Sequence, residues 1–103
     1  MFLGLDLGTS GVKGVVVDDN QCVIASASAP LNVSRPKELW SEQNPEDWWN
    51  AVETVVLSLR QAAGPQWSGI RAIGLSGQMH GAVLLDEAGL PVRPAILHND
   101  GRS

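Results

Sequence analysis

The sequence has a single cysteine, Cys22, among its 103 residues. One thiol forms no disulfide within the chain and supplies no zinc cluster, so both kinds of stabilisation are excluded. The chain also lacks a basic cluster, because seven lysines and arginines stand against eleven acidic residues and the net charge is −4. A weakly acidic chain of this kind gives no support to binding of nucleic acid or of a membrane surface.

Long apolar runs are absent as well. No run approaches the roughly 18 apolar residues of a membrane-spanning helix. The N-terminus shows neither the basic segment nor the long apolar segment of a secretory signal. Apolar residues make up 44% of the chain and charged residues 17%, as in an ordinary globular domain. We therefore expect a cytoplasmic protein in a reducing compartment.

The stretch 2–18 reads as two short strands joined by a tight turn. The first half is apolar and ends on Asp6, and the second is a β-branched run, Val15 to Val17. Small, turn-prone residues separate the halves: Gly8, Thr9, Ser10 and Gly11. The backbone N–H groups of such a turn can converge on an anion, and the two hydroxyls add donors beside them. Phosphate is the natural candidate.

The position of Asp6 sharpens this interpretation. A carboxylate beside a phosphate-binding turn suits Mg²⁺, which keeps most of its waters and bridges to substrate oxygens. Asp6 would then hold the metal through water, and Lys13 would supply positive charge. The alternative is a plain hairpin in which Asp6 caps a strand and Lys13 is solvated. The spacing of glycines 4, 8, 11 and 14 matches neither the dinucleotide-binding nor the Walker motif.

The clearest helix follows a long loop, predicted over residues 26–43. Asn44 is a good N-cap, Pro45 suits the first helical position, and the dipeptide Gly64-Pro65 ends the helix. Apolar residues recur along one face at helical spacing: Trp48, Val52, Val55, Val56, Leu59 and Ala63.

Strands are predicted on both sides of this helix. Cys22 to Ala25 would complete an antiparallel meander with the first two strands, and Ile70 to Ser76 would be buried on at least one face. Further strands are expected at 82–86 and, more edge-like, at 90–97. This order predicts an α/β domain with a mixed sheet that contains antiparallel N-terminal hairpins.

Two further groups of polar residues are candidates for binding. Gln78 and His80 lie in a glycine-bounded loop after a predicted strand, where their side chains can donate to and accept from a polyol. A structural or solvated histidine is the alternative. Asn99, Asp100 and Arg102 stand near the end of the chain, either as ligand contacts or as a surface turn with an internal ion pair. Such a polar ending also suggests a fragment of a longer protein.

Four segments carry a family resemblance, and together they span essentially the whole chain: GLDLGTSGVK, WSEQNPEDWW, GLSGQMHGAVLLD and RPAILHNDGRS. They resemble the corresponding segments of xylulokinases within the FGGY carbohydrate kinases. The first also resembles the phosphate-binding hairpin of the actin-like, hexokinase-like (ribonuclease H-like) ATPases. The resemblance implies that residues 1–103 are the N-terminal portion of the sugar-binding domain. A second, ATP-binding domain and the catalytic base would lie beyond this chain.

The resemblance also assigns site residues. It implies that Asp6 organises Mg²⁺ through water and that ATP phosphates meet Gly8, Thr9, Ser10, Gly11 and Lys13. The sugar would meet Gln78, Met79, His80, Asn99, Asp100 and Arg102. His98 stands where these kinases usually have tryptophan, which leaves the identity of the sugar open. Glycerol kinases carry an Arg-Glu pair in place of Met79-His80, which argues against glycerol.

The implied activity is transfer of the ATP γ-phosphoryl group to a pentulose, with D-xylulose as the expected substrate. Another FGGY sugar or polyol kinase, acting on gluconate or ribulose, is an alternative, as is a non-catalytic fragment that binds a nucleotide or a sugar. The isolated chain of 103 residues is expected to be inactive. The expected partners are a small sugar and ATP, without nucleic acid or membrane, and a homodimer is left open.

Overall fold

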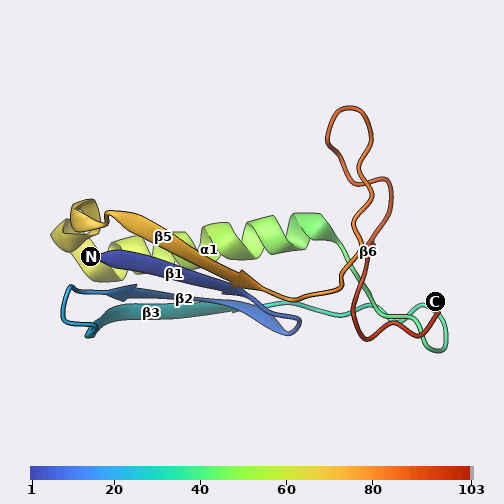
Figure 1. The fold of residues 1–103 in the computed structure, drawn as a ribbon, viewed down its shortest axis with the longest axis horizontal. Helices are drawn as coiled ribbons and strands as arrows, with labels where there is room; N and C mark the ends of the chain where they lie inside the picture. Colours follow the sequence, from blue (N-terminus) through green and yellow to red (C-terminus); the bar gives the residue numbers. More distant parts are fainter. Residues whose placement is uncertain (103) are drawn as a thin grey trace.

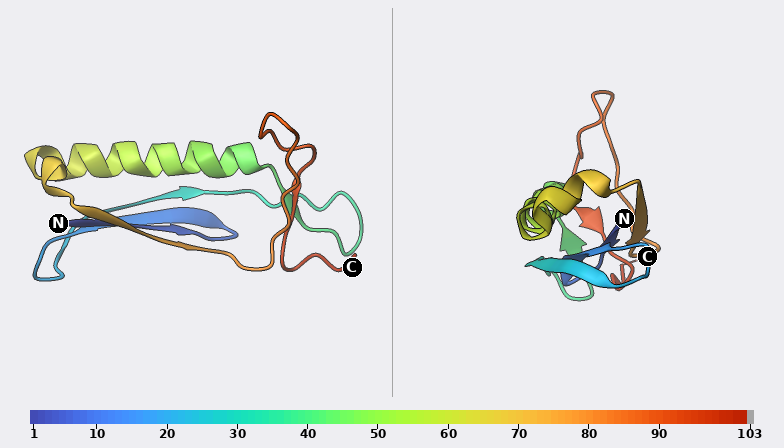
Figure 2. Two further views of the ribbon diagram at one scale, coloured as in Figure 1. Left: turned by 45° about the horizontal axis from the view of Figure 1, so that its top comes forward. Right: turned by 90° about the vertical axis from the view of Figure 1, so that its left-hand side faces the viewer.

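The computed structural model describes residues 1–102, and its main feature is a mixed sheet with one long helix across one face (Figures 1 and 2). The sheet has the strand order β3-β2-β1-β5, and a small second sheet pairs β4 with β6. The strands are β1 (Phe2–Leu7), β2 (Gly11–Val17), β3 (Val23–Pro30), β4 (Glu42–Gln43), β5 (Ala72–Gly77) and β6 (Ala95–Ile96). The helix α1 spans Pro45–Ala63 and continues into a short 3₁₀ helix, Gly64–Gly69.

The predicted N-terminal hairpin is confirmed. β1 and β2 pair antiparallel, with Asp6 opposite Lys13. The Gly8 N–H donates to the Gly11 carbonyl at 3.0 Å and closes the turn between them. β5 then adds to the other side of β1 in parallel, which makes the sheet mixed, as expected.

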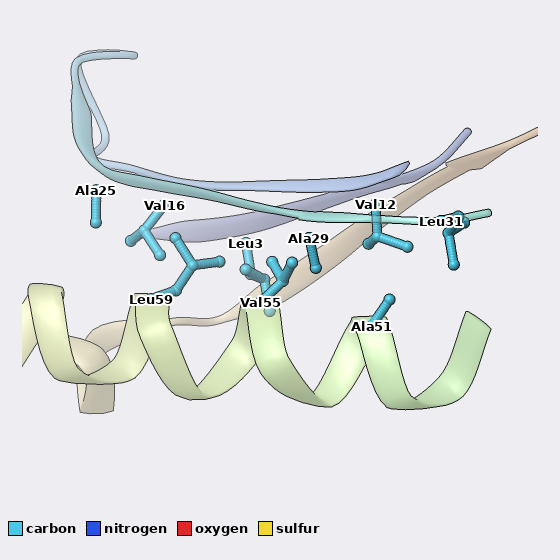
Figure 3. Packing of buried hydrophobic residues seen from close by; sticks show 9 residues of the cluster. All are labelled: Leu3, Val12, Val16, Ala25, Ala29, Leu31, Ala51, Val55 and Leu59. Carbon is cyan, nitrogen blue, oxygen red and sulfur yellow. The ribbon is translucent and has the colours of Figure 1, made fainter. Parts of the chain in front are cut away.

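Both predicted ends of the helix are confirmed. The Asn44 side chain accepts a hydrogen bond from the Glu46 N–H at 3.0 Å, and Pro45 takes the first helical position. The helix ends at Gly64, whose φ of 59° is a conformation that glycine adopts readily. Figure 3 shows the face that α1 turns toward the sheet, with its buried residues Ala51, Val55 and Leu59 labelled. Ala63 is also buried on this helix.

The predicted third strand was wrong in its extent. β3 begins after Cys22, which is exposed, and runs on to Pro30 through residues that were predicted as loop. Residues 26–29 alternate serine and alanine, so they carry no strong hydrophobic signal. Their backbone nevertheless pairs with β2, and Ala29 is buried in the core beneath α1. Small side chains suit this place because the helix packs closely over it.

The predicted burial of the strand at 70–76 was also wrong. β5 exists, but all six of its residues are exposed, and Leu75 retains 78% of its accessible surface. The reason is its place in the sheet. α1 packs over β2 and β3, whereas β5 lies at the outer edge beyond β1.

The segment 82–97 contains less strand than predicted. Ala82 and Leu85 form only isolated bridges, to Ile96 and Pro91, and just two residues of the return strand belong to β6. Prolines at 91 and 94 explain this, because proline offers no N–H to a sheet ladder. The part of this segment that precedes β6 instead projects from the main sheet as a narrow loop (Figure 1). Within residues 1–102, no helix combines the length and hydropathy that crossing a membrane requires.

The packing of α1 on β2 predicts that substitution by alanine changes stability very differently at two strand glycines, Gly14 and Gly74. A Cβ added at Gly14 would lie 2.6 Å from Val55 Cγ1 and 2.8 Å from Leu59 Cδ1, which is too close for any carbon pair. We expect Gly14→Ala to lower the free energy of unfolding of the chain by about 1–3 kcal/mol, as overpacking of a core does. Urea unfolding measures this.

Gly74→Ala is the matched control, since nothing lies within 4 Å of the Cβ that it would add. It should be neutral, or stabilising by up to about 1 kcal/mol through the loss of unfolded-state freedom. Equal losses at both positions would contradict this account of the core.

Candidate functional site

The parallel pairing of β1 with β5 brings two of the predicted site segments to one end of the sheet. Leu7 is the register partner of Gly77, so the turn after β1 and the loop after β5 leave the same edge (Figure 1). The Gln78 N–H donates to the Leu7 carbonyl at 3.0 Å, and the Thr9 hydroxyl donates to Gln78 Oε1 at 3.3 Å. The predicted phosphate turn and the predicted sugar loop are therefore in direct contact.

Asp6 lies on the face of the sheet away from α1. Leu3, Val12 and Val16 point into the core, so alternation along the strands turns Asp6 and its partner Lys13 to the opposite side. From β5, the Ser76 hydroxyl donates to Asp6 Oδ1 at 3.0 Å. In the described chain no protein donor reaches the other carboxylate oxygen. These three polar side chains line a shallow depression of about 430 Å³.

The turn after β1 presents backbone donors. Among residues 1–102, no protein acceptor takes a hydrogen bond from the N–H groups of Thr9 or Ser10. The Ser10 carbonyl accepts from the Leu31 N–H at 3.0 Å, which ties the turn to the segment after β3. Two adjacent N–H groups of this kind suit an anion.

The donor set at this end of β1 fits magnesium only together with other ligands. The described residues contain no group of three or more histidine, cysteine or acidic side chains that could hold a metal ion. Asp6 offers a single carboxylate, and Mg²⁺ commonly takes one or two protein carboxylates, several waters and phosphate oxygens. The residues present therefore fit a hydrated Mg²⁺ that a phosphate also binds.

The loop after β5 carries its predicted residues outward. Met79 and His80 are exposed, and the φ of His80 is 62°. A non-glycine residue in this left-handed region is uncommon and costs about 1 kcal/mol or more. Such departures concentrate at binding and active-site loops.

Two of the predicted residues near the C-terminus, Asp100 and Arg102, form an internal ion pair, which the sequence had left open as an alternative to ligand contacts. The Asp100 side chain is only 1% exposed and lies 2.5 Å from Arg102 Nη2. It also accepts from the Ser41 N–H at 2.7 Å. Hydrogen bonding from the Arg102 guanidinium holds the pKa of the Asp100 carboxyl well below its ordinary value. Asn99 is exposed, whereas Ser103 lies outside the described residues.

Arg102 is held on several sides. Its guanidinium lies 3.1 Å from Glu42 Oε2 and stacks over the Trp40 ring at 3.6 Å from the centroid. Arg93 pairs with the same Glu42 carboxylate. The polar atoms of Asp100 and Arg102 are thus engaged with their neighbours, whereas Asn99 is exposed.

Sequence reasoning missed the segment that joins these parts. Ser41, Glu42 and Gln43 were predicted only as the end of a loop, yet they are exposed by 0%, 5% and 2%. Gln43 donates to the Thr9 carbonyl at 2.6 Å, and Ser41 and Glu42 hold the C-terminal ion pair. The available signal was their position in WSEQNPEDWW, immediately before a well-capped helix.

Comparison with known proteins gives a consistent family match. The model of the FGGY family of carbohydrate kinases, N-terminal domain, matches residues 1–103. Xylulose kinase of Klebsiella pneumoniae is 49% identical over 102 residues, which are 99% of this chain and 21% of that protein. The chain thus spans about a fifth of the length of such relatives.

Solved structures agree with the fold. The crystal structure of a "xyloylose kinase" from Brucella ovis has a TM-score of 0.94 and 52% identity, and covers 97% of this chain and 21% of that one. Xylulose kinase of Rhodospirillum rubrum has a TM-score of 0.90 and 36% identity, and covers 97% of this chain and 20% of that one. The expected α/β fold with a mixed sheet, as part of an actin-like ATPase domain, is confirmed.

The ion pair predicts a pH dependence of stability. Because the folded chain binds the Asp100 proton more weakly than the unfolded chain does, the carboxylate stabilises the fold above its ordinary pKa of about 4. That contribution is lost progressively as the pH falls below this value. Asp100→Asn should therefore be less stable than the parent at pH 7, and the difference should shrink toward pH 3. Urea unfolding midpoints across this range measure it.

Asn99→Ala is a neutral change in the same segment and serves as the control. Its difference from the parent should stay constant over the same pH range. A constant difference for Asp100→Asn as well would show that the carboxylate does not contribute through its charge.

Proposed function

The chain belongs to the FGGY family of carbohydrate kinases, and we propose that the complete protein transfers the γ-phosphoryl group of Mg-ATP to a pentulose, D-xylulose. The observation that carries the proposal is the contact between the turn after β1 and the loop after β5. This contact brings the turn, with its two N–H groups that no described acceptor takes, beside an exposed Met79-His80 pair, which supports a kinase that holds a nucleotide next to a sugar. Relatives named xylulose kinase favour this sugar over gluconate or ribulose.

We also propose how the complete protein is divided into domains. Residues 1–103 are the N-terminal portion of the sugar-binding domain, and the longer protein supplies a second ATP-binding domain and the catalytic base. The chain alone should therefore not turn over any sugar. We further propose a cytoplasmic protein with small-molecule substrates and without nucleic acid or membrane partners, and we leave a homodimer open.

We assign the phosphates of ATP to the turn after β1 and to the charged side chains of Asp6 and Lys13. Thr9 and Ser10 donate backbone N–H groups to phosphate oxygens, Gly8 and Gly11 let the backbone come close, and Lys13 adds positive charge. Asp6 would hold a hydrated Mg²⁺ through its waters, and the metal would supply charge neutralisation at the phosphates. Phosphoryl transfer leaves the protein mainly positioning and charge stabilisation, and these residues can supply both.

The residues that we assign to the sugar fall into two groups, those that are exposed and those whose polar atoms already have protein partners. Met79, His80 and Asn99 are exposed and can meet the sugar directly. Gln78, Asp100 and Arg102 also line this end of the molecule. Their polar atoms already bind neighbours, so their part is mainly to hold the site in shape.

A substrate panel tests the proposed activity. The complete protein should phosphorylate D-xylulose with Mg-ATP at a higher kcat/KM than D-ribulose or gluconate, and it should leave glycerol almost untouched. A preference for gluconate or ribulose would keep the kinase and change the sugar. No turnover with any of them would favour the alternative of a non-catalytic binding protein.

Asp6→Asn in the complete protein tests the role of the carboxylate. If Asp6 organises Mg²⁺, the neutral amide removes charge where the metal must be fixed, and kcat should fall by about 10² to 10³. If Asp6 only caps a strand, the amide should cost about 1 kcal/mol of stability and leave turnover nearly intact. The measurement is kcat across a magnesium titration, with thermal stability followed in parallel.

His80→Ala is the contrasting variant, because we place it on the sugar alone. It should raise KM for the sugar by the equivalent of about 1–3 kcal/mol and leave ATP affinity without sugar unchanged.

For Asp6, a folded Asp6→Asn protein that turns over within a factor of about three of the parent, at low as well as high magnesium, would refute the metal role.

A further inference from the structure

The side-chain amide of Gln43 uses every hydrogen-bonding group that it has, although it is buried to 2% exposure. Its Nε2 donates to the carbonyls of Thr9 at 2.6 Å and Asn32 at 3.5 Å. Its Oε1 accepts from Trp48 Nε1 at 2.9 Å and from Gln78 Nε2 at 3.4 Å. Two donors and two acceptor sites are the full capacity of a carboxamide.

These four contacts fix the orientation of the amide. Turning it over would point Nε2 at two N–H donors and Oε1 at two carbonyl oxygens, so all four contacts would become repulsive. A leucine of similar size would leave the four polar groups that meet the amide without this partner. A glutamate would keep the acceptors and lose both donors. Glutamine is the residue that satisfies this place.

Three of the residues close a ring of hydrogen bonds. Gln43 donates to the Thr9 carbonyl, Gln78 donates to Gln43, and the Thr9 hydroxyl donates to Gln78. The ring begins where the ladder between β1 and β5 ends, at Leu7 and Gly77. Beyond that point it holds the turn after β1 and the loop after β5 at a fixed spacing.

We propose that Gln43 is a positioning residue that sets the distance between the phosphate turn and the sugar loop. The inference rests on the proposed function, because it assigns those two segments to the two substrates. Gln43 acts through Thr9 and Gln78 and touches neither substrate. An in-line transfer depends on the placement of both reactants, and a misplacement of about 1 Å can cost up to about 10² in rate.

Two substitutions in the complete protein test the proposal. Gln43→Glu keeps oxygens for Trp48 and Gln78 and loses the donors to Thr9 and Asn32, whereas Gln43→Leu loses all four contacts. We expect kcat at saturating substrates to fall by about 10-fold to 100-fold, more for leucine. Equilibrium affinities for D-xylulose alone and for ATP alone should change by less than about threefold, since each half-site stays intact.

Val55→Ala is the control for stability. Val55 is fully buried in the core of α1 and β2, away from the ring, so its truncation lowers thermal stability without touching the amide. Its kcat should stay near that of the parent. An equal fall in kcat for Val55→Ala, or unchanged kcat in both Gln43 variants, would overturn the positioning role.

Hydrogen exchange in the complete protein gives a readout that does not need activity. In Gln43→Leu, protection should fall together at the Gly8 N–H in segment 8–11 and at the Gln78 N–H in segment 77–81, which are both hydrogen-bonded to backbone carbonyls. Adding Gln78→Leu should lower it little further, because both changes break one ring. Unchanged protection in both segments would overturn the inference. A parent protein that phosphorylates no sugar would overturn the proposed function instead, and the exchange result would still decide whether the ring sets the spacing.

Discussion

The burial of three consecutive polar side chains, Ser41, Glu42 and Gln43, constrains the whole end of the molecule that carries the candidate site. A buried polar group without a partner costs about 1–3 kcal/mol, and more when it is charged. In residues 1–102, every buried side-chain nitrogen and oxygen has a partner. Arg35 binds the Ser41 hydroxyl, and the other partners of these three residues come from segments far apart in the sequence: the turn after β1, the loop after β5, Arg93, and the C-terminal Asp100-Arg102 pair, whose Asp100 accepts from the Ser41 backbone N–H. The hydrogen bonds and ion pairs of residues 41–43 therefore fix the positions of those segments relative to one another.

The segment solves this problem in two different ways. Glu42 meets two arginines, and buried ion pairs of that kind add little net stability while they demand one geometry. Gln43 has no charge to desolvate and meets four neutral groups with matched polarity. The charged half holds the C-terminal segment, and the neutral half holds the turn and the loop. Glu42 and Gln43 are buried, whereas Met79, His80 and Asn99 at the same end of the molecule are exposed.

The features that the sequence predicted correctly depend on neighbours in the chain. The Asn44-Pro45 start of the helix, its end at Gly64 and the hairpin turn all arise within a few residues, so their signals are local. The extent of β3 depends on pairing with β2, and the exposure of β5 depends on which strands α1 covers. The role of Gln43 depends on a contact with Thr9 across 34 positions. No local pattern encodes such a contact.

The two faces of the sheet separate folding from the proposed chemistry. Leu3 on β1 and Val12 on β2 point into the core beneath α1. Asp6 and Lys13, on the same two strands, point away from it. Because side chains alternate along a strand, the same backbone can bury one set and expose the other. The metal role that we propose for Asp6 therefore does not compete with packing. Gln43 differs, because its amide lies at the point where the core, the turn and the loop meet, and there a folding contact and a positioning contact are the same hydrogen bonds.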